Sequence, residues 1–385
     1  MKPLARQVQP SVTMGLDQQA RALMAAGRDV INLTAGQVDL AMPMAGKEAV
    51  LKAIREDRTG YVPAVGSPDV KAAVRRHMGW TEGEVLISAG AKPLLNAAVA
   101  CLVGPGEEVI LPAPCYTSYP EMVRLAGGQP VLALGEAKQD FIVSGEAVRR
   151  RITDRTKAIL LNNPVNPTGA VYSYEALREI ADVCIRHDLY IIADEVYDTF
   201  VYEGAFTSLY ALPDMRDRLI LVNSASKSFA MAGLRLGYCT APQPVAKAMA
   251  AYLSHALGCP CSLSERAALA VLALDDSYEK KVKAVFRDRR DMLYHALAEI
   301  EGLKIQKNAG AFYLWLDVSP WDEDTSFCQR LLDREGVALT PGSAFCCPGY
   351  VRLAYAKDGP TLLEAAARMK RFVEENYSSS SGVSR

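Results

Sequence analysis

The chain has 385 residues, half of them hydrophobic, and a formal net charge of −1. This length favours two domains with a large buried core, and the balanced charge excludes a global basic field for nucleic acid or an anionic membrane. No apolar run approaches the roughly 18 residues that cross a bilayer, and residues 1–7 lack the apolar region of a secretory signal. We therefore expect a cytoplasmic protein that acts on a small molecule.

The nine cysteines are odd in number and scattered along the chain. This pattern is typical of reduced, cytoplasmic thiols. The closest pairs, Cys259 with Cys261 and Cys346 with Cys347, are not spaced as zinc knuckles, and the four histidines lie far apart. We expect no metal site.

In chain order, the pattern predicts a helix at residues 15–26, ended by Gly27, and a short strand at 30–33. From Val85 onward, short runs that are apolar almost throughout alternate with helical patterns, of which 174–187 is one. Strands buried on both faces have this composition, so a mostly parallel sheet covered by helices follows. The predicted strands are 85–87, 108–111, 130–134, 158–161, 190–193, 219–222 and 236–239.

Beyond residue 241 the chain is predicted to be helical, with a long stretch at 262–300 that connects two domains. Residues 313–317, 336–342 and 350–355 are predicted strands of a smaller domain, followed by a final helix at 362–375. The Ser-rich segment 377–385 is predicted to be a disordered tail.

The motif Ser224-x-x-Lys227 follows the predicted strand 219–222, with Arg235 eight residues after the lysine. Open α/β sheets bind ligands just beyond the carboxyl ends of their strands. Lys227 should therefore lie on a loop at the carboxyl end of this strand. A lysine is more often a solvated surface charge. Here the flanking serines and the arginine suit an anionic cofactor, and apolar neighbours suit an amine whose pKa is low enough to form a Schiff base.

Other polar motifs follow the remaining predicted strands. Gly90-Ala91-Lys92 opens a helix, whose free N–H groups bind phosphate well, although glycine-rich helix starts are common. Tyr116 lies in a Pro-rich loop, where packing is the ordinary role of an aromatic ring. Asn162-Asn-Pro-Val-Asn166-Pro-Thr-Gly169 follows the strand 158–161, and Asp194 follows 190–193 with Tyr197 three residues later.

Arg352 stands within an apolar predicted strand. A buried arginine costs free energy unless it pairs with an anion, and its planar fork matches a carboxylate. A structural ion pair is the competing interpretation.

Together these motifs resemble the fold type I, class I/II aminotransferases that use pyridoxal 5'-phosphate (PLP), over about residues 9–372. The resemblance implies an α/β fold of the PLP-transferase type I kind, with a mostly parallel seven-stranded sheet flanked by helices and a smaller α/β domain. It places the large PLP-binding domain at 45–285 and a discontinuous small domain at 1–44 and 286–376. Two positions depart from the family pattern: Ala91 replaces a glycine, and Gln37-Val38-Asp39 replaces Glu/Asn-Pro-Asp.

The resemblance also implies a role for each motif. Lys227 would hold PLP as an internal aldimine, Asp194 would keep the pyridine nitrogen protonated, and Tyr116 would stack on the ring. Tyr197 and Asn166 would share the phenolic oxygen. The phosphate would contact Gly90, Ala91, Lys92, Ser224, Ser226, Arg235 and, from a partner subunit, Tyr61. The substrate would contact Gly36, Asn166 and Arg352, the last through its α-carboxylate.

The predicted activity is ping-pong transfer of an amino group between an L-amino acid and a 2-oxo acid, in a homodimer. A β-eliminating lyase shares all these cofactor residues and stays open. A PLP-sensing regulatory module is disfavoured, because no basic helix-turn-helix precedes the resemblance. The amino donor is not determined; residues 12–16, 37–42 and Tyr313 are expected to select it, and Asp39 is the only charge among them.

Overall fold

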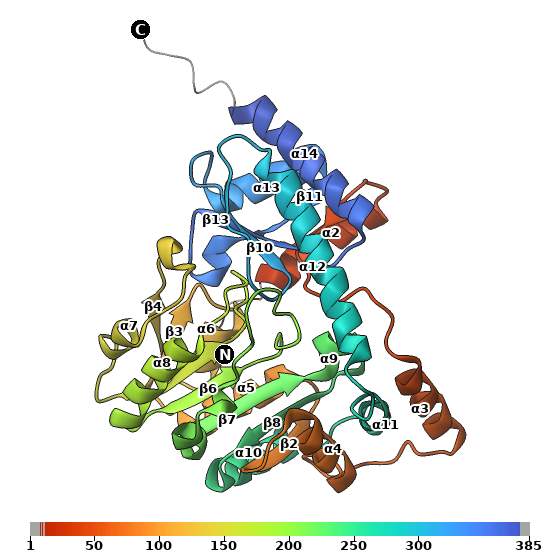
Figure 1. The fold of residues 1–385 in the computed structure, drawn as a ribbon, viewed down its shortest axis with the longest axis vertical. Coiled ribbons are helices and arrows are strands. Elements are labelled where there is room, and N and C mark those ends of the chain that lie inside the picture. The colour runs from red at the N-terminus through yellow and green to blue at the C-terminus, as the bar shows by residue number, and fades with distance from the viewer. Residues whose placement is uncertain (1–7, 9, 11, 378–385) are drawn as a thin grey trace.

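The computed structural model describes residues 8, 10 and 12–377. Of the predicted tail, only Tyr377 lies within the described residues. Figure 1 shows a broad sheet with helices on both sides and, above it, a smaller group of strands and helices, with the long helix α12 running between the two parts. The domain boundaries predicted at residues 45 and 285 stay a prediction.

A seven-stranded sheet forms the larger part, in the order β2-β8-β7-β6-β5-β3-β4. The five strands from β7 to β4 are parallel, whereas β8 is antiparallel to both of its neighbours. The mostly parallel sheet predicted from the sequence is thereby confirmed. The strands are β2 (Glu84–Ser88), β3 (Glu108–Ala113), β4 (Gln129–Leu134), β5 (Thr156–Asn162), β6 (Tyr190–Asp194), β7 (Leu219–Ser224) and β8 (Gly237–Ala241).

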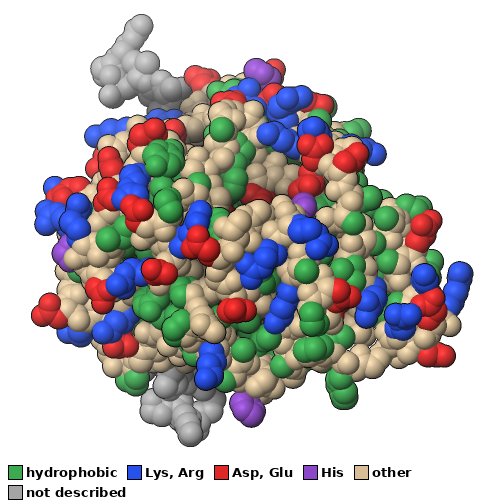
Figure 2. Space-filling view, turned by 60° about the horizontal axis from the view of Figure 1, so that its bottom comes forward, with side chains coloured by type: hydrophobic (Ala, Val, Ile, Leu, Met, Phe, Trp, Pro, Cys, Tyr) green, Lys and Arg blue, Asp and Glu red, His purple; other side chains and the backbone are tan. Residues whose placement is uncertain are grey.

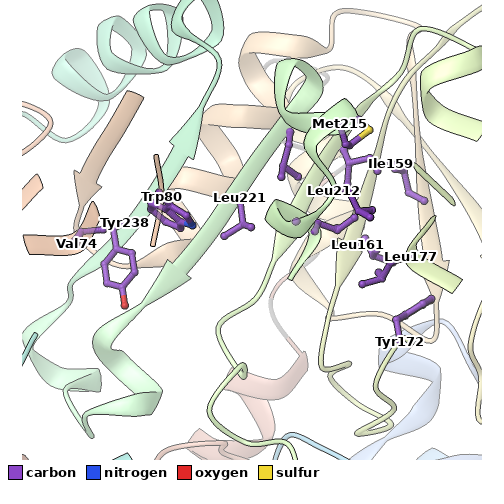
Figure 3. Packing of buried hydrophobic residues seen from close by; sticks show 14 of the residues in the cluster. Val74, Trp80, Ile159, Leu161, Tyr172, Leu177, Leu212, Met215, Leu221 and Tyr238 are labelled. Carbon is purple, nitrogen blue, oxygen red and sulfur yellow. The ribbon is translucent and has the colours of Figure 1, made fainter. Parts of the chain in front are cut away.

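Both faces of this sheet are buried, which explains the nearly continuous apolar runs. Along β5, Ile159 and Leu161 pack into one hydrophobic cluster, and Ala158 and Leu160 pack into a second cluster on the opposite face. Figure 3 shows part of the first cluster, in which Leu161 lies beside Leu177 of α8. Alternating side chains of a strand point to opposite faces, so a strand covered on both sides needs apolar residues at every position.

Helices cover the two faces in separate sets. The second cluster is completed by α5 (Ala91–Leu102), α6 (Ser118–Leu125) and α10 (Gln243–Ala256). The first is completed by α3 (Met44–Arg55), α4 (Pro68–Met78), α7 (Gly145–Arg149), α8 (Tyr174–Arg186) and α11 (Ser262–Val271). Short 3₁₀ helices occur at Ala137–Gln139, Leu209–Ala211, Pro213–Arg218, Ala232–Leu234 and Gly342–Phe345.

The smaller part is built on an antiparallel sheet in the order β12-β13-β10-β9. Its elements are β9 (Lys304–Ile305), β10 (Tyr313–Asp317), β12 (Thr340–Pro341), β13 (Tyr350–Ala354), α12 (Ser277–Ala298), α13 (Asp324–Glu335) and α14 (Gly359–Tyr377). The N-terminal helix α2 (Val12–Ala25) and strand β1 (Ile31–Asn32) join this part, because β1 pairs in parallel with β11 (Val337–Ala338).

Residues 262–300 are mainly helical, as predicted, but form two helices. The chain leaves the helical path between α11 and α12, where the Asp275 carboxylate accepts hydrogen bonds from both the backbone and the hydroxyl of Ser277. The prediction for residues 336–342 was wrong in part, because they form not one strand but the short strands β11 and β12, which belong to different sheets. Local patterns do not show which partner each half of such a segment will pair with.

On the face shown in Figure 2, basic and acidic side chains are interspersed among hydrophobic ones. No helix within residues 12–377 is long and apolar enough to span a membrane.

Candidate active site

The carboxyl ends of β5, β6 and β7 meet at one edge of the large sheet. The last residues of β5 and β6, Asn162 and Asp194, are register partners, and β7 ends beside them at Ser224. All three residues line a cavity of about 690 Å³, a volume typical of small-molecule sites. Most predicted site residues also line it: Gly36, Ala91, Lys92, Tyr116, Asn166, Asp194, Tyr197, Ser224, Ser226, Lys227, Arg235 and Arg352.

Lys227 lies in α9 (Ala225–Ser228), a single helical turn that directly follows β7, and not on a loop as predicted. Ser224 caps this turn: its Oγ accepts a hydrogen bond from the N–H of Ser226 at 3.0 Å and donates to the carbonyl of Leu236 at 3.0 Å. The cap holds the start of the turn against the neighbouring strand β8, and so fixes the position of Lys227.

The ammonium group of Lys227 donates to the carbonyl of Gly36, on the segment that links the smaller part to the cavity. Burial lowers the pKa of Lys227 to about 8, with the positive charges of Arg352 and Arg235 acting in the same direction and Asp194 opposing them. Near neutral pH this amine is therefore close to the point where it can exchange a proton or act as a nucleophile.

Asp194 is the buried carboxylate at the floor of the cavity. Its Oδ2 accepts a hydrogen bond from the hydroxyl of Tyr119 at 2.6 Å. Burial raises its pKa to about 6, although the hydrogen bonds from Tyr119 and from the N–H of Val196, and the charge of Lys227, lower it. The group is therefore mainly ionised at neutral pH and suited to stabilise a buried cation.

Asn166, Tyr197 and Tyr313 form a polar group on one wall. The Tyr197 and Tyr313 hydroxyls lie 2.8 Å apart, and the Asn166 amide donates to Tyr197 at 3.5 Å. Burial raises the pKa of both tyrosines, so both are protonated donors at neutral pH. The Asn166 amide and the Tyr197 hydroxyl thus lie next to each other in the cavity.

The start of α5 forms an anion cradle beside Arg235. Gly90 precedes this 12-residue helix with a positive φ of 99°, and no side chain caps the free N–H groups of the first turn. A Cβ on Gly90 would overlap the Arg235 guanidinium, and a Cβ on Gly237 would overlap the backbone of Gly90 and Ala91. The two glycines therefore let helix start and guanidinium approach each other closely, where both favour an anion.

Arg352 is buried on β13 without an ion-pair partner among the residues that the structure describes. Its guanidinium donates to Asn166 Oδ1 at 2.9 Å and to the carbonyl of Thr34, while its Nε has no hydrogen-bond partner. The rings of Tyr313 and Phe345 flank it at 4.5 and 4.8 Å. The geometry thus disfavours a structural ion pair and leaves a buried cation with donor capacity for an anionic ligand.

Tyr116 and Lys92 lie side by side at the cavity wall. The Lys92 ammonium group is 5.3 Å from the centre of the Tyr116 ring and donates to Ser118 Oγ at 3.1 Å. Lys92 is exposed, in contrast to the partly buried Lys227 and the buried Arg352. A positive charge therefore stands at the mouth of the cavity, separate from those at its floor.

Two predicted site residues, Gly90 and Tyr61, do not line the cavity; Gly90 lies just before α5, and Tyr61 lies farther away. The Tyr61 side chain is fully exposed. It follows α3, a helix with further exposed apolar side chains at Met44, Leu51 and Ile54.

Sequence reasoning missed three contributors. Tyr119 lies in the first turn of α6, and its ring contacts that of Tyr116, which precedes the helix, edge to face at 5.5 Å between centroids. Asn162 donates to the carbonyl of Asp194 at 2.8 Å and accepts from the N–H of Asn166 at 2.7 Å. Tyr313, expected only to influence selectivity, occupies the space that a side chain on Gly36 would need. Its polar contacts come from distant segments, so no local pattern predicts them.

Comparison with known proteins places this geometry in context. Residues 28–369 match the family model described as aminotransferase class I and II. An aspartate/prephenate aminotransferase of Thermus thermophilus is 37% identical over 96% of this chain and 99% of its own length. An aspartate aminotransferase of Geobacillus stearothermophilus is 36% identical, over 95% and 96%. The solved structure of a Thermus thermophilus aspartate aminotransferase with maleate has a TM-score of 0.93 at 36% identity, covering 96% of this chain and 99% of that one.

The lowered pKa of Lys227 predicts how the stability of the apoprotein depends on pH. Between pH 8 and about 10.5 the unfolded chain binds more protons at this lysine than the folded chain, so the free energy of unfolding rises with pH by up to about 1.4 kcal/mol per unit. Lys227→Met should lack this contribution. Its free energy of unfolding should therefore exceed that of the wild-type protein by the largest amount below pH 8. Chemical unfolding at several pH values measures it.

The exposed residue Lys138 supplies the matched control. Lys138→Met should leave the pH profile parallel to that of wild type. A Lys227→Met profile that is also parallel would show that the folded protein does not lower the pKa of this amine.

Proposed function

The chain belongs to the class I and II aminotransferases, PLP-dependent enzymes that transfer an amino group between an amino acid and a 2-oxo acid, and from this premise we propose the residues that carry out the reaction here and the substrate they select. The observation that carries the proposal is the buried Lys227 amine between the Asp194 carboxylate and the anion cradle.

The cavity fits PLP. The uncapped start of α5 and the Arg235 guanidinium suit the phosphate, and a Cβ on Gly90 would fill the gap between them. Tyr116 offers a ring face for the pyridine, and Asp194 an ionised carboxylate for its nitrogen. Asn166 and Tyr197 offer donors for the phenolic oxygen. When bound, PLP supplies an aldehyde carbon for amines and a protonated ring that withdraws electrons from the substrate's Cα.

Lys227 acts as the proton carrier. With a pKa of about 8, its amine accepts a proton from Cα and gives one back without a large free-energy penalty in either direction. Asp194 stays ionised and would stabilise the protonated pyridine nitrogen of PLP. Tyr119 fixes the orientation of this carboxylate through a hydrogen bond of 2.6 Å. The short turn α9 keeps the amine close to the two carbons between which the proton would move, the substrate's Cα and the aldehyde carbon (C4') of PLP.

Arg352 binds the α-carboxylate of the substrate. Its Nε has no hydrogen-bond partner, and two aromatic rings hold the guanidinium in place and away from water. A carboxylate is the anion that matches a guanidinium bidentately. Asn166 stands between this arginine and Tyr197, so the substrate and cofactor subsites share one side chain.

We propose a dicarboxylic amino acid such as aspartate as donor. The curated relatives above are named for aspartate, and Lys92 provides a cation at the cavity mouth that is bound only to a neutral hydroxyl among the described partners. Asp39, the one acid among the segments expected to select the donor, is engaged by Arg289 at 2.6 and 2.9 Å. Its charge is thus neutralised and does not repel a second substrate carboxylate.

We also propose a cytoplasmic homodimer in which Tyr61 contacts the phosphate in the partner's site. The full exposure of Tyr61 and the apolar residues exposed on α3 support a protein interface at this face. The nine cysteines are all free thiols, as expected in a reducing compartment.

The primary test of the function is chemical. Borohydride reduction of the holoenzyme should attach PLP to Lys227, as peptide mass spectrometry will show, and Lys227→Ala should give no such adduct and almost no turnover. With stoichiometric aspartate, a 2-oxo acid should form without free ammonia. With a donor that carries a leaving group at Cβ, such as S-methylcysteine, release of pyruvate, ammonia and the thiol would indicate a β-eliminating lyase instead.

Two substitutions separate the carboxylate subsites. Arg352→Ala should lower kcat/KM for every donor by similar factors, roughly 30- to 1,000-fold or about 2–4 kcal/mol, because all donors share the α-carboxylate. Lys92→Met, which keeps the backbone donor of α5, should lower kcat/KM for aspartate by about tenfold and leave alanine almost unchanged. A loss in Arg352→Ala confined to acidic donors would contradict this assignment.

Complementation tests the shared site. Tyr61→Phe should weaken PLP binding by roughly tenfold, the value of a hydrogen bond to a charged group, whereas Tyr174→Phe on α8 should not. Mixed dimers of Lys227→Ala and Tyr61→Phe chains should contain one site with wild-type PLP affinity, since the first chain supplies Tyr61 to the second. Uniformly weak sites, or an active monomer in sedimentation, would refute the arrangement.

A further inference from the structure

The turn that follows β6 has a second face that the proposed chemistry does not use. Asp194 and Tyr197 from this segment line the active-site cavity. The next residue, Asp198, turns away from it and lines a separate cavity of about 790 Å³ on the other side. The same short segment thus forms part of two walls.

Asp198 is joined to the end of β7 by a direct pair. Its Oδ2 accepts a hydrogen bond from the Asn223 amide at 2.7 Å, and the Asn223 Oδ1 accepts one from the N–H of Ser224 at 2.6 Å. Ser224 is the residue that caps α9. The Asp198–Asn223 pair therefore connects the turn that directly follows Asp194 to the start of the helical turn that carries Lys227.

A second connection lies at the other end of α9. The hydroxyl of Thr199 is 3.0 Å from the hydroxyl of Ser228, the residue after Lys227, and 3.2 Å from a carboxylate oxygen of Glu279 on α12. Ser228 is buried. Thus two adjacent residues, Asp198 and Thr199, hold both ends of α9.

The charge of Asp198 gives the first connection a fixed orientation. Burial raises its pKa to about 6, with Glu279 acting in the same direction, while Asn223, the N–H of Thr199 and the nearby His77 lower it. It is therefore mainly ionised at neutral pH. An ionised carboxylate can only accept hydrogen bonds, so it forces the amide of Asn223 to face it and the Asn223 oxygen to face Ser224.

We propose that Asp198, Asn223 and Thr199 are positioning residues of the amino-transfer reaction, which hold the turn bearing Asp194 and Tyr197 in register with the helical turn bearing Lys227. The proposal rests on the function proposed above for Lys227 and Asp194. None of the three residues touches the reacting atoms; they act by restricting how far the amine can move from the position where it takes the Cα proton.

The test uses the full-length holoenzyme and the variants Asp198→Ala, Asn223→Ala and their combination. In each, kcat should fall on the order of 10- to 100-fold, the effect of a small displacement of a catalytic group, while KM for aspartate changes by less than about threefold. The kinetic isotope effect with aspartate deuterated at Cα should increase, because proton transfer becomes more rate-limiting. The double variant should be no worse than the poorer single variant, since both break one interaction.

Two further variants separate positioning from general loss of structure. Asp198→Asn retains an acceptor oxygen for Asn223 and should recover most of the activity and the wild-type isotope effect. Asn308→Ala removes a buried asparagine of the smaller part, which donates to Tyr355 at 3.0 Å, and should leave the isotope effect unchanged. If an alanine variant does not fold by circular dichroism, Thr199→Val, which removes only the second connection, should show the same increase.

Unchanged isotope effects in the folded variants, or additive losses in the double variant, would overturn the positioning role. Failure of the proposed function has a different signature, since borohydride would then attach no PLP to Lys227 of the wild-type enzyme.

Discussion

The desolvation of the Lys227 amine, reinforced by the charges of Arg352 and Arg235, is the constraint on which the site depends. Lys227 and Arg352 lie in one cavity with Arg235 nearby, and Asp194 is the only buried carboxylate that faces them among the described residues that line it. Desolvated charges of one sign cost free energy, which the protein relieves by lowering the pKa of the lysine. In the proposed function, a phosphate and a substrate carboxylate would bring negative charge to these cations. The burial that disfavours the charged form of the amine is thus what makes it reactive.

The sheet makes this concentration of charge possible. Because parallel strands end at one edge, side chains that follow β5, β6 and β7 come together without long loops. The antiparallel strand β8 then brings Gly237 against Gly90, so the chain around Arg235 lies next to the start of α5. Connections behind the site, from Asp198 and Thr199, keep neighbouring strand ends from moving independently.

Much of this arrangement could be predicted from the sequence, and the remainder could not for identifiable reasons. The apolar runs predicted the seven strands. They therefore also predicted the edge of the sheet at which Asn166, Asp194 and Lys227 lie. The contacts that orient them were not visible, because Tyr119, Asn162 and Tyr313 reach their partners through the fold and have no special local pattern.

The same limit applies to the break before α12 and to the split of residues 336–342. In each case the local pattern was compatible with one continuous element. Where a segment breaks depends on partners elsewhere in the chain: β11 leaves its neighbour β12 in order to pair with β1, more than 300 residues away.

The sequence departs from the family pattern at Val38, where a proline is usual, and the structure shows what holds the segment instead. Val38 is buried in the core of the smaller part, and Asp39 is held bidentately by Arg289 of α12. Together these contacts restrain the chain on the C-terminal side of Gly36, whose carbonyl accepts from Lys227. A proline would restrict only the backbone φ at its own position, whereas this ion pair attaches the segment to the helix that links the two parts. The placement of the Lys227 amine is therefore coupled to α12 twice, through Asp39 on one side and through Glu279 and Thr199 on the other.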